Sequence, residues 1–167
     1  MNLFIIFCSQ YLLYVLAAAA ILYWATLSRR AKRRLALYAT LTGTVAFILA
    51  KIGSALYYNP RPFMVDHVTS LFAHNPGNGF PSDHTLAAAT LAFALFAVSK
   101  KWGIVFFLLA LAVGSARVSA GVHHPIDVIG GIVFAAAGYS AACVFAPKLH
   151  SLITRRRHKI REPKTQS

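Results

Sequence analysis

The chain has 167 residues, of which 57% are hydrophobic and 13% are charged, and its mean hydropathy is +0.59. This is the material of one domain, and it has too little polar surface for a soluble globular protein, so the composition places the chain in a lipid bilayer. The formal net charge of +13 does not indicate a nucleic-acid-binding protein, because the basic residues cluster at the ends of apolar runs.

Five apolar runs follow one another, and each predicts a transmembrane helix. The first, residues 3–27, carries no charge and is long enough to span the hydrocarbon core. It lacks the basic start and short apolar core of a secretory signal, so we interpret it as a retained helix. The other runs cover approximately residues 35–58, 82–99, 102–119 and 126–147. We therefore expect an all-α, polytopic membrane helix bundle with about five transmembrane helices.

The end of the chain differs in composition from the rest. Its last dozen or so residues are polar and mostly basic. We expect residues 1–154 to form the membrane-embedded domain and residues 155–167 to form a disordered, basic cytoplasmic tail.

The charge pattern predicts how the helices are oriented. Residues 29–34, the pair 100–101 and the segment 148–167 carry five, two and seven of the 17 Lys and Arg residues, all on one side of a five-helix arrangement. This side is expected to be cytoplasmic, since cytoplasmic loops are enriched in Lys and Arg. Only Lys51, Arg61 and Arg117 remain on or near the outer side. Charges at that depth usually face a bundle interior or a watery cavity, which makes all three candidates for function.

These cations and one helix start are suited to binding a phosphate. Arg61 and Arg117 can bind phosphate oxygens bidentately, and Lys51 adds a point charge. The run 81–85, Pro-Ser-Asp-His-Thr, leads into an apolar stretch as a capped helix start does, and its free N–H groups would face an anion. We predict that the phosphate-binding residues are Lys51, Arg61, Ser82, Asp83 and Arg117.

Three further residues are predicted to be catalytic. A neutral imidazole can attack phosphorus, so His123 is the candidate nucleophile. Asp127, four residues later, would hydrogen-bond the other ring nitrogen and fix the tautomer. His84, on another helix, is left to protonate the leaving oxygen and later to activate water.

Each of these residues has a structural alternative when it is taken alone. Lys51 could anchor a helix at the membrane surface, and Asp127 could simply favour a helix dipole. To explain the whole set without a functional site, all of these structural interpretations would have to be true at once. The combination therefore favours a site. The remaining histidines of the central region have weaker cases: His124 could cap the last helix, and His67 and His74 are expected to be loop residues.

The sequence does not favour a metal site. Nitrogen and oxygen ligands could come from Asp83, His84, His123, His124 and Asp127. Three Lys and Arg side chains near the same point would nevertheless repel a divalent ion and complement a phosphate. Cys8 and Cys143 lie in apolar runs, which argues against a disulfide framework or a thiolate metal site. We expect neither a metal nor another cofactor.

Together these motifs resemble the type 2 phosphatidic acid phosphatase family of membrane lipid phosphatases, which share an active-site pattern with the vanadium haloperoxidases. The family pattern is Lys-x6-Arg-Pro, Pro-Ser-Gly-His and Ser-Arg-x5-His-x3-Asp. The third motif is matched by Arg117, His123 and Asp127 with its spacing intact, except that Ala116 separates the arginine from the preceding serine. The resemblance runs from Lys51 to Asp127. It implies a metal-independent phosphatase with a phosphohistidine intermediate on His123.

Two departures from the family pattern are similar to its bacitracin-resistance branch, the bacterial undecaprenyl-diphosphate phosphatases. Nine residues rather than six separate Lys51 from Arg61, and Asp83 stands in place of glycine. That branch implies release of inorganic phosphate from undecaprenyl diphosphate at the outer face of the inner (plasma) membrane, which regenerates a carrier for cell-wall peptidoglycan synthesis. A carboxylate near a phosphate should repel it. Three explanations for Asp83 are compatible with the sequence: it is protonated, it is paired with a cation, or it is turned toward the helix-start amides.

Other functions remain as alternatives. Within the same chemistry, the lipid could be phosphatidic acid or phosphatidylglycerophosphate, because nothing in the sequence measures the length of the lipid chain. A more distant alternative is a small membrane transporter that uses His84, His123 and Asp127 as a relay, although a relay needs ionisable groups at several depths. The expected partners are the polyprenyl diphosphate or phospholipid substrate and membrane lipids, with no nucleic acid, and a homo-oligomer is compatible with the sequence.

Overall fold

The computed structural model describes residues 2–66 and 68–161, with side chains as far as Leu149. These residues form seven helices and no strand, which confirms the all-α fold class. The helices are α1 (Asn2–Gln10), α2 (Leu12–Thr26), α3 (Arg29–Leu56), α4 (Pro62–Val65), α5 (Asp83–Phe96), α6 (Lys100–Ser119) and α7 (Pro125–Arg161).

Helices occupy all five positions at which the sequence predicts a transmembrane segment. By length and composition, α3, α6 and the Pro125–Leu149 part of α7 can each cross a membrane. The helices α1 and α2 are bent by 50° where they meet and would count as a fourth span if taken together. Helix α5 has 14 residues, fewer than the roughly 20 that a full span needs. The expected total of about five is therefore reached only with the bent pair and a short helix.

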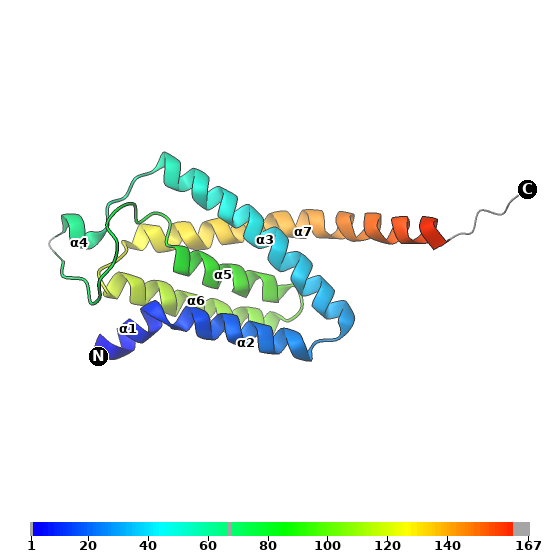
Figure 1. Ribbon diagram of the computed structural model, residues 1–167, viewed down its shortest axis with the longest axis horizontal. Helices are drawn as coiled ribbons and strands as arrows, with labels where there is room; N and C mark the ends of the chain where they lie inside the picture. Colours follow the sequence, from blue (N-terminus) through cyan, green and yellow to red (C-terminus); the bar gives the residue numbers. More distant parts are fainter. Residues whose placement is uncertain (1, 67, 162–167) are drawn as a thin grey trace, which may run out of the picture.

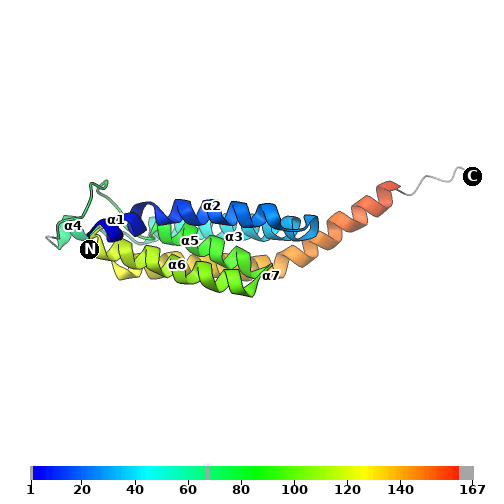
Figure 2. The same ribbon diagram turned by 90° about the horizontal axis from the view of Figure 1, so that it is seen from below.

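The long helices lie side by side, and α3 crosses the others obliquely (Figure 1). The second view shows the same elongated bundle (Figure 2). The chain's N-terminus, α4 and the connection between α3 and α5 gather at one end, which we call the α4 end. The turns from α2 to α3 and from α5 to α6 lie at the opposite end, and α7 extends beyond them. The α4 end is thus separated from the other by the length of the bundle.

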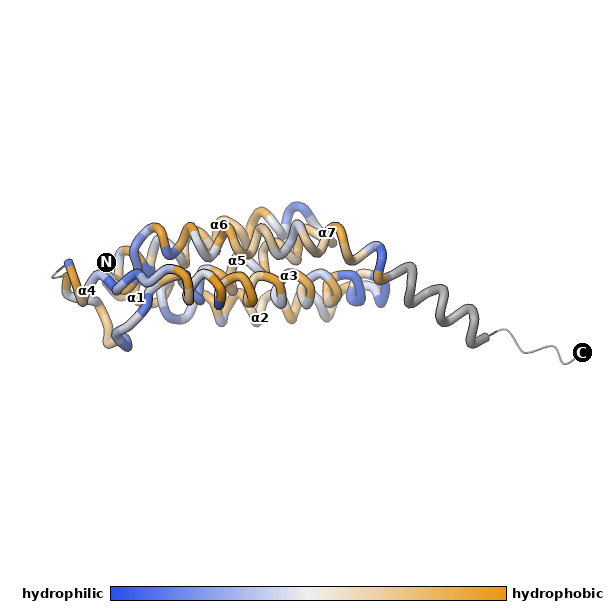
Figure 3. Tube along the Cα trace, turned by 90° about the horizontal axis from the view of Figure 1, so that it is seen from above, coloured by the Kyte–Doolittle hydropathy of each residue, from blue (hydrophilic) through white to orange (hydrophobic). Residues whose placement is uncertain are grey.

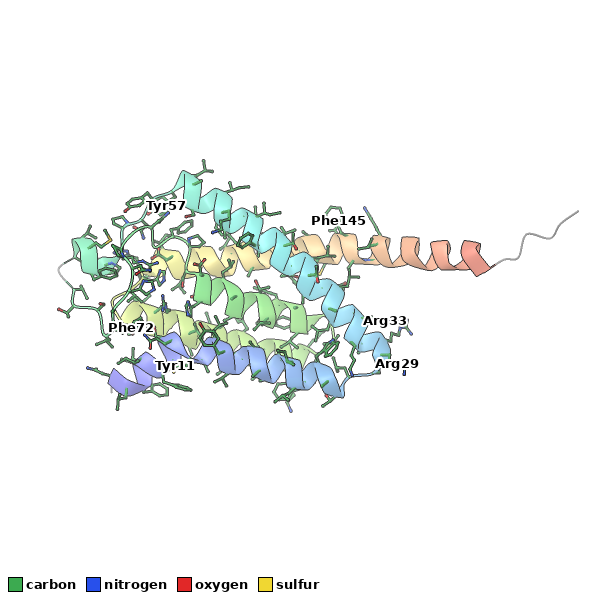
Figure 4. The ribbon with its side chains drawn as sticks, viewed as in Figure 1. Tyr11, Arg29, Arg33, Tyr57, Phe72 and Phe145 are labelled. Atoms are coloured by element: carbon green, nitrogen blue, oxygen red, sulfur yellow. The ribbon has the colours of Figure 1, made fainter. Side chains whose placement is uncertain are left out.

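Serine caps begin the two helices that start at the opposite end. The Ser28 side chain accepts a hydrogen bond from the Ala31 N–H, and the Ser99 side chain accepts one from the Trp102 N–H, each at 3.4 Å. Basic residues follow both caps, and positive charge at a helix start opposes the helix dipole. Helix stability therefore does not explain their placement, whereas membrane orientation does. Figure 3 shows this end as hydrophilic, and Figure 4 shows Arg29 and Arg33 on it.

Small side chains allow the helices to approach closely. The buried core contains many alanines: Ala46, Ala50, Ala88, Ala89, Ala92, Ala94, Ala110 and Ala135. Where α7 meets α3, a Cβ atom at Gly138 would collide with the backbone carbonyl of Thr42. Such contacts between small residues are how membrane helices pack, since burial from lipid provides no hydrophobic driving force.

Large apolar side chains cover the outside of the bundle. Ile21 is 65% exposed, Leu108 59% and Val133 53%. Figure 3 shows hydrophobic residues along the middle of the helices between more polar ends. An outer surface of this kind is unfavourable in water and favourable in lipid, so the chain is a membrane protein.

The expectation of a disordered tail from residue 155 is wrong as far as Arg161. Helix α7 passes through Pro147 and continues to Arg161 without a break. Residues 148–161 contain no glycine or proline and are rich in Leu, Lys and Arg, which are good helix formers. The rest of the expected tail, residues 162–167, and His67 lie outside the described residues.

Candidate active site

The connection between α3 and α5 folds back over the α4 end of the bundle. Its two limbs meet at an isolated bridge between Pro60 and Asn78. Asn78 fastens both limbs, because its Nδ2 donates to the carbonyl oxygens of Ser54 and Tyr57 at 3.0 Å each and its Oδ1 accepts from the Asn59 N–H at 2.9 Å. The Pro-Arg-Pro segment that follows Asn59 is thereby held in a fixed place.

His123 and Asp127 form a buried pair at the start of α7. Their exposed fractions are 3% and 0%, and His123 Nδ1 lies 3.2 Å from Asp127 Oδ2. The carboxylate also accepts hydrogen bonds from Asn59 Nδ2 at 2.8 Å and from the His124 backbone N–H at 2.9 Å, which fixes its orientation. Because a carboxylate can only accept, the Nδ1 of His123 carries a proton, and Nε2 is left with its lone pair.

Two guanidinium groups face that lone pair. Arg61 Nη1 lies 3.1 Å and Arg117 Nη2 lies 3.2 Å from His123 Nε2. Arg61 comes from the connection and is held by the Val122 carbonyl oxygen at 2.9 Å, whereas Arg117 comes from the last turn of α6 and is 2% exposed. The structure therefore brings the predicted nucleophile and two of the predicted phosphate-binding residues together.

Neither guanidinium has a carboxylate partner among the residues whose side chains are described. The ion pairs found there are His123–Asp127 and His124–Asp66. The Nε atoms of Arg61 and Arg117 are both buried and have no hydrogen-bond partner. A buried donor without a partner is costly, and two of them on positively charged groups indicate that an anion completes the site.

The start of α5 packs directly against α7 beside this group. Ser82, the residue at the N-cap of α5, is fully buried, and its N–H donates to the Asp127 carbonyl oxygen at 3.0 Å. A Cβ atom at Gly131 would lie 3.0 Å from the Leu86 nitrogen and 3.1 Å from the Ser82 carbonyl oxygen, so the absence of a side chain permits this approach. The Ser82 hydroxyl accepts from Thr85 Oγ1 at 3.1 Å. The first N–H groups of α5 therefore lie next to the His123–Asp127 pair.

Asp83 and His84 occupy the first turn of α5. His84 is half-buried and interacts electrostatically with Arg117 and His123. Asp83 is exposed and interacts with Arg61, Arg117 and His84. Both predicted residues are thus in the neighbourhood of the site, with His84 half-buried and Asp83 exposed.

Lys51 is the predicted residue that the structure does not bring to this group. It lies on the exposed face of α3, and its ammonium group sits over the Phe47 ring, 5.2 Å from the centroid. The buried residues of this part of α3 are Ala46 and Ala50, on another side of the helix. Lys51 therefore points away from the bundle.

Burial changes the pKa values of His123 and Arg61, two site residues that lie in loops. It lowers the pKa of His123, an effect that the Asp127 hydrogen bond partly opposes. It also lowers the pKa of Arg61, although Asp127 and Asp83 act in the other direction. Neutral pH therefore leaves His123 uncharged, since even a free histidine has a pKa of about 6.5. An uncharged imidazole is the form that can attack phosphorus.

Sequence reasoning missed two members of the group. Asn59 bonds Asp127, and its position directly before the Pro-Arg-Pro segment was a usable signal. His74 was interpreted as a loop residue, yet its Nε2 lies 2.7 Å from Arg117 Nη2. No spacing or periodicity marks a single histidine in a long connection. Within the described residues, no cluster of three or more His, Cys, Asp or Glu could hold a metal ion.

Comparison with known proteins places the chain in a family. The PAP2 superfamily matches residues 31–151, which run from α3 into α7 and include every predicted site residue. The chain belongs to the PAP2 superfamily. The resemblance inferred from the three motifs is thereby confirmed.

Two relatives and one solved structure are similar to this PAP2 chain over most of their length. The "Bacitracin transport permease protein BcrC" of Bacillus licheniformis is 40% identical over 153 residues, 89% of this chain and 73% of that protein. The "Undecaprenyl-diphosphatase BcrC" of Bacillus subtilis (strain 168) is 30% identical over 130 residues, 78% of this chain and 67% of that protein. The crystal structure of Aquifex aeolicus LpxE matches with a TM-score of 0.69 and 27% identity, and covers 85% of this chain and 84% of that one.

Proposed function

We propose that this PAP2 protein is an undecaprenyl-diphosphate phosphatase, which hydrolyses its lipid substrate to undecaprenyl phosphate and inorganic phosphate. The observation that carries the proposal is the setting of His123, with a carboxylate on one ring nitrogen and two guanidinium groups facing the other. The relative from Bacillus subtilis, which is named an undecaprenyl-diphosphatase, supports the choice of lipid.

The terminal phosphate binds between the cations and the start of α5. Arg61 and Arg117 each have a buried, unpartnered Nε–H that can donate to a phosphate oxygen. The free N–H groups that follow Ser82 donate from another side, and the helix dipole favours the negative charge there. These donors are fixed before the substrate arrives, so they stabilise the charge that spreads over the equatorial oxygens during transfer.

His123 then attacks as the nucleophile. Its Nε2 lone pair forms a bond to the terminal phosphorus, and the bond from phosphorus to the bridging oxygen breaks. Asp127 holds the Nδ1 proton and stabilises the positive charge that develops on the ring. The product of this step is a phosphohistidine and undecaprenyl phosphate.

His84 serves as the acid and then as the base. It donates a proton to the bridging oxygen as undecaprenyl phosphate leaves, and it then takes a proton from the water that attacks the phosphohistidine. That second step releases inorganic phosphate and returns His123 to its neutral form. The assignment rests on the location of His84, which lies half-buried in the first turn of α5 near Arg117 and His123.

The α4 end is proposed to face the extracytoplasmic side of the inner (plasma) membrane. Arg29 and Arg33 mark the opposite end of the bundle (Figure 4), where the positive-inside bias places the cytoplasm. Residues 1–154 would then be the membrane-embedded phosphatase domain, and residues 155–167 would lie in the cytoplasm. The apolar outer surfaces of the helices would receive the lipid tail.

The name of the relative from Bacillus licheniformis describes a transport permease, so transport is the competing function. A relay across the bilayer needs ionisable groups at several depths. The buried charged residues among those described are Arg117, His123 and Asp127, and all three gather at the α4 end. Their arrangement favours phosphate chemistry at one surface of the membrane.

The deciding experiment measures inorganic phosphate released from undecaprenyl diphosphate by the purified protein in detergent. It includes EDTA and is run beside His123→Ala. We expect release that survives EDTA and disappears in the variant. Phosphatidic acid and phosphatidylglycerophosphate are assayed in parallel, and faster release from either would replace the proposed lipid. No release from any of the three would reject the phosphatase proposal, and equal activity of the two proteins would remove His123 from the reaction.

A further inference from the structure

His74 contacts the machinery of the site from outside the three sequence motifs. It belongs to the connection between α4 and α5, which is anchored to the end of α6 by a hydrogen bond of 3.1 Å from the Leu71 N–H to the Ala120 carbonyl oxygen. Three residues beyond that anchor, His74 Nε2 lies 2.7 Å from Arg117 Nη2. This is the shortest of the side-chain contacts that Arg117 makes with the described residues.

The direction of this hydrogen bond follows from the groups involved. A guanidinium only donates, so His74 Nε2 must accept with its lone pair. The proton of a neutral His74 then lies on Nδ1, which is 3.3 Å from the Asn75 carbonyl oxygen and can donate to it. Both ring nitrogens thus have a defined role. Protonation of Nε2 would remove the acceptor and place a second positive charge beside the guanidinium.

The same loop also brings an aromatic ring, that of Phe72, to the guanidinium. Arg117 Cζ lies 5.8 Å from the centroid of the Phe72 ring, and the Phe72 and His74 rings are 6.2 Å apart. On its other side Arg117 donates from Nη1 to the Ser9 carbonyl oxygen of α1 at 3.4 Å. One loop and one helix outside the motifs therefore hold the guanidinium, and its buried Nε–H is left without a partner.

We propose that His74 is a positioning residue for Arg117: by accepting from Nη2, it turns the guanidinium so that Nε–H faces the phosphate. This inference rests on the proposed function, since it concerns the same phosphate site. A guanidinium fixed in advance stabilises the transition state more than one that must be ordered during the reaction. His74 therefore contributes mainly to turnover.

The surroundings of His74 keep it in the accepting form. Arg61 from the α3–α4 connection, Arg117 from α6 and His123 from the turn before α7 face the ring, and each lowers its pKa. Burial lowers the pKa most, whereas the Asn75 carbonyl raises it. Neutral His74 is the result at pH 7.

The test compares variants that keep or remove the acceptor. His74→Phe keeps a ring without an acceptor, His74→Gln offers an amide oxygen near the position of Nε2, and Asn75→Ala is the matched control because that exposed side chain lies in the same loop. Phosphate release is measured with the lipid that the wild type uses. We expect kcat to fall about tenfold or more in His74→Phe with a smaller change in KM, and to stay within about threefold of the wild type in His74→Gln and Asn75→Ala.

A double-mutant cycle shows whether His74 acts through Arg117. In the Arg117→Lys background, His74→Phe should change kcat less than about twofold, because the guanidinium that it positions is already gone. A full tenfold loss in that background would overturn the proposal. So would wild-type kcat in His74→Phe, or a His74→Gln variant as slow as His74→Phe.

Folding and the proposed function are checked separately. Thermal unfolding in detergent identifies a variant that has lost its structure, and His74→Leu then replaces His74→Phe as the protein without an acceptor. If the wild type releases no phosphate from any of the three lipids, the proposed function fails and this inference fails with it. If the wild type is active and the variants match it, only the role of His74 is rejected.

Discussion

The two ends of the bundle both carry arginine, but in opposite settings. At one end, Arg29 and Arg33 are exposed and follow a helix cap (Figure 4). At the α4 end, Arg61 and Arg117 converge on one histidine nitrogen, and each has a buried Nε–H without a partner. An exposed guanidinium keeps its water and serves to orient the chain, whereas a buried pair without carboxylates needs an anion.

The difference teaches that the environment of a charged side chain, and not its type, assigns its role. The residue type alone, arginine, is the same at both ends. Burial and the direction of hydrogen bonds distinguish them, and substitutions at matched positions can test that distinction.

The largest effect is expected when the His123–Asp127 pair is disrupted, and the His124–Asp66 pair serves as the comparison. In Asp127→Asn, the amide can donate to His123 Nδ1, which moves the ring proton to Nε2 and removes the attacking lone pair. We expect phosphate release to fall about 10³-fold or more, by analogy with the carboxylate of catalytic triads. The control is Asp66→Asn, because Asp66 is half-exposed and bonds His124 at 2.9 Å without touching His123. Asp66→Asn should change kcat less than about threefold, and similar losses in both variants would contradict the distinction.

A smaller effect is expected from changing the shape of one guanidinium while keeping its charge. Arg117→Lys removes the planar fork that donates to His74 and His123 and that, in the proposed mechanism, donates from Nε to the phosphate. We expect kcat/KM to fall about 10²-fold, the typical loss for one preorganised donor. Arg33→Lys at the opposite end should leave kcat/KM unchanged. Wild-type turnover in Arg117→Lys would remove this residue from the site.

Much of the fold could be predicted from the sequence because apolar runs determine where membrane helices form. The runs located all five helical regions, including the short α5. The break between α1 and α2 could not be predicted, because no proline or glycine marks Tyr11. The helical residues 155–161 were also missed, since their basic polar composition was interpreted as disorder although the segment lacks helix breakers.

The candidate site could be predicted where the sequence spacing of two residues implies that their side chains are in contact. Asp127 follows His123 by four positions, which matches a contact across one helical turn, and the structure has that contact. His74 reaches the site through the long connection, whose path no local pattern describes, whereas Asn59 is next to the Pro-Arg-Pro segment. The sequence also could not predict which way Lys51 points from α3. Residues 45–50 are all apolar, so they do not indicate which face of the helix is buried.

The protonation of His123 offers a direct physical test of its burial. Burial lowers the pKa and Asp127 raises it, with burial the larger effect, so His123 should be half-protonated below the value of about 6.5 for a free histidine. Nuclear magnetic resonance of histidine-labelled protein in detergent measures the pKa of His123 in the absence of substrate, so that ionisation of the substrate does not contribute. The signal that is missing from His123→Asn belongs to His123. A pKa above 6.5 would show that the carboxylate outweighs burial, and the nucleophile would then lose its lone pair already at mildly acidic pH.

The smallest effect is predicted for Lys51, where the motif and the structure disagree. The resemblance assigns it to the phosphate, but its ammonium group lies over Phe47 on the exposed face of α3. A side chain on that face can anchor the helix at the membrane surface, which contributes little to turnover. Lys51→Ala should therefore change kcat/KM less than about threefold, while Arg61→Ala, measured beside it, should lower kcat/KM by about 10² or more. A tenfold or larger loss in Lys51→Ala would mean that α3 turns when substrate binds and brings the ammonium group to the phosphate, as the motif predicts.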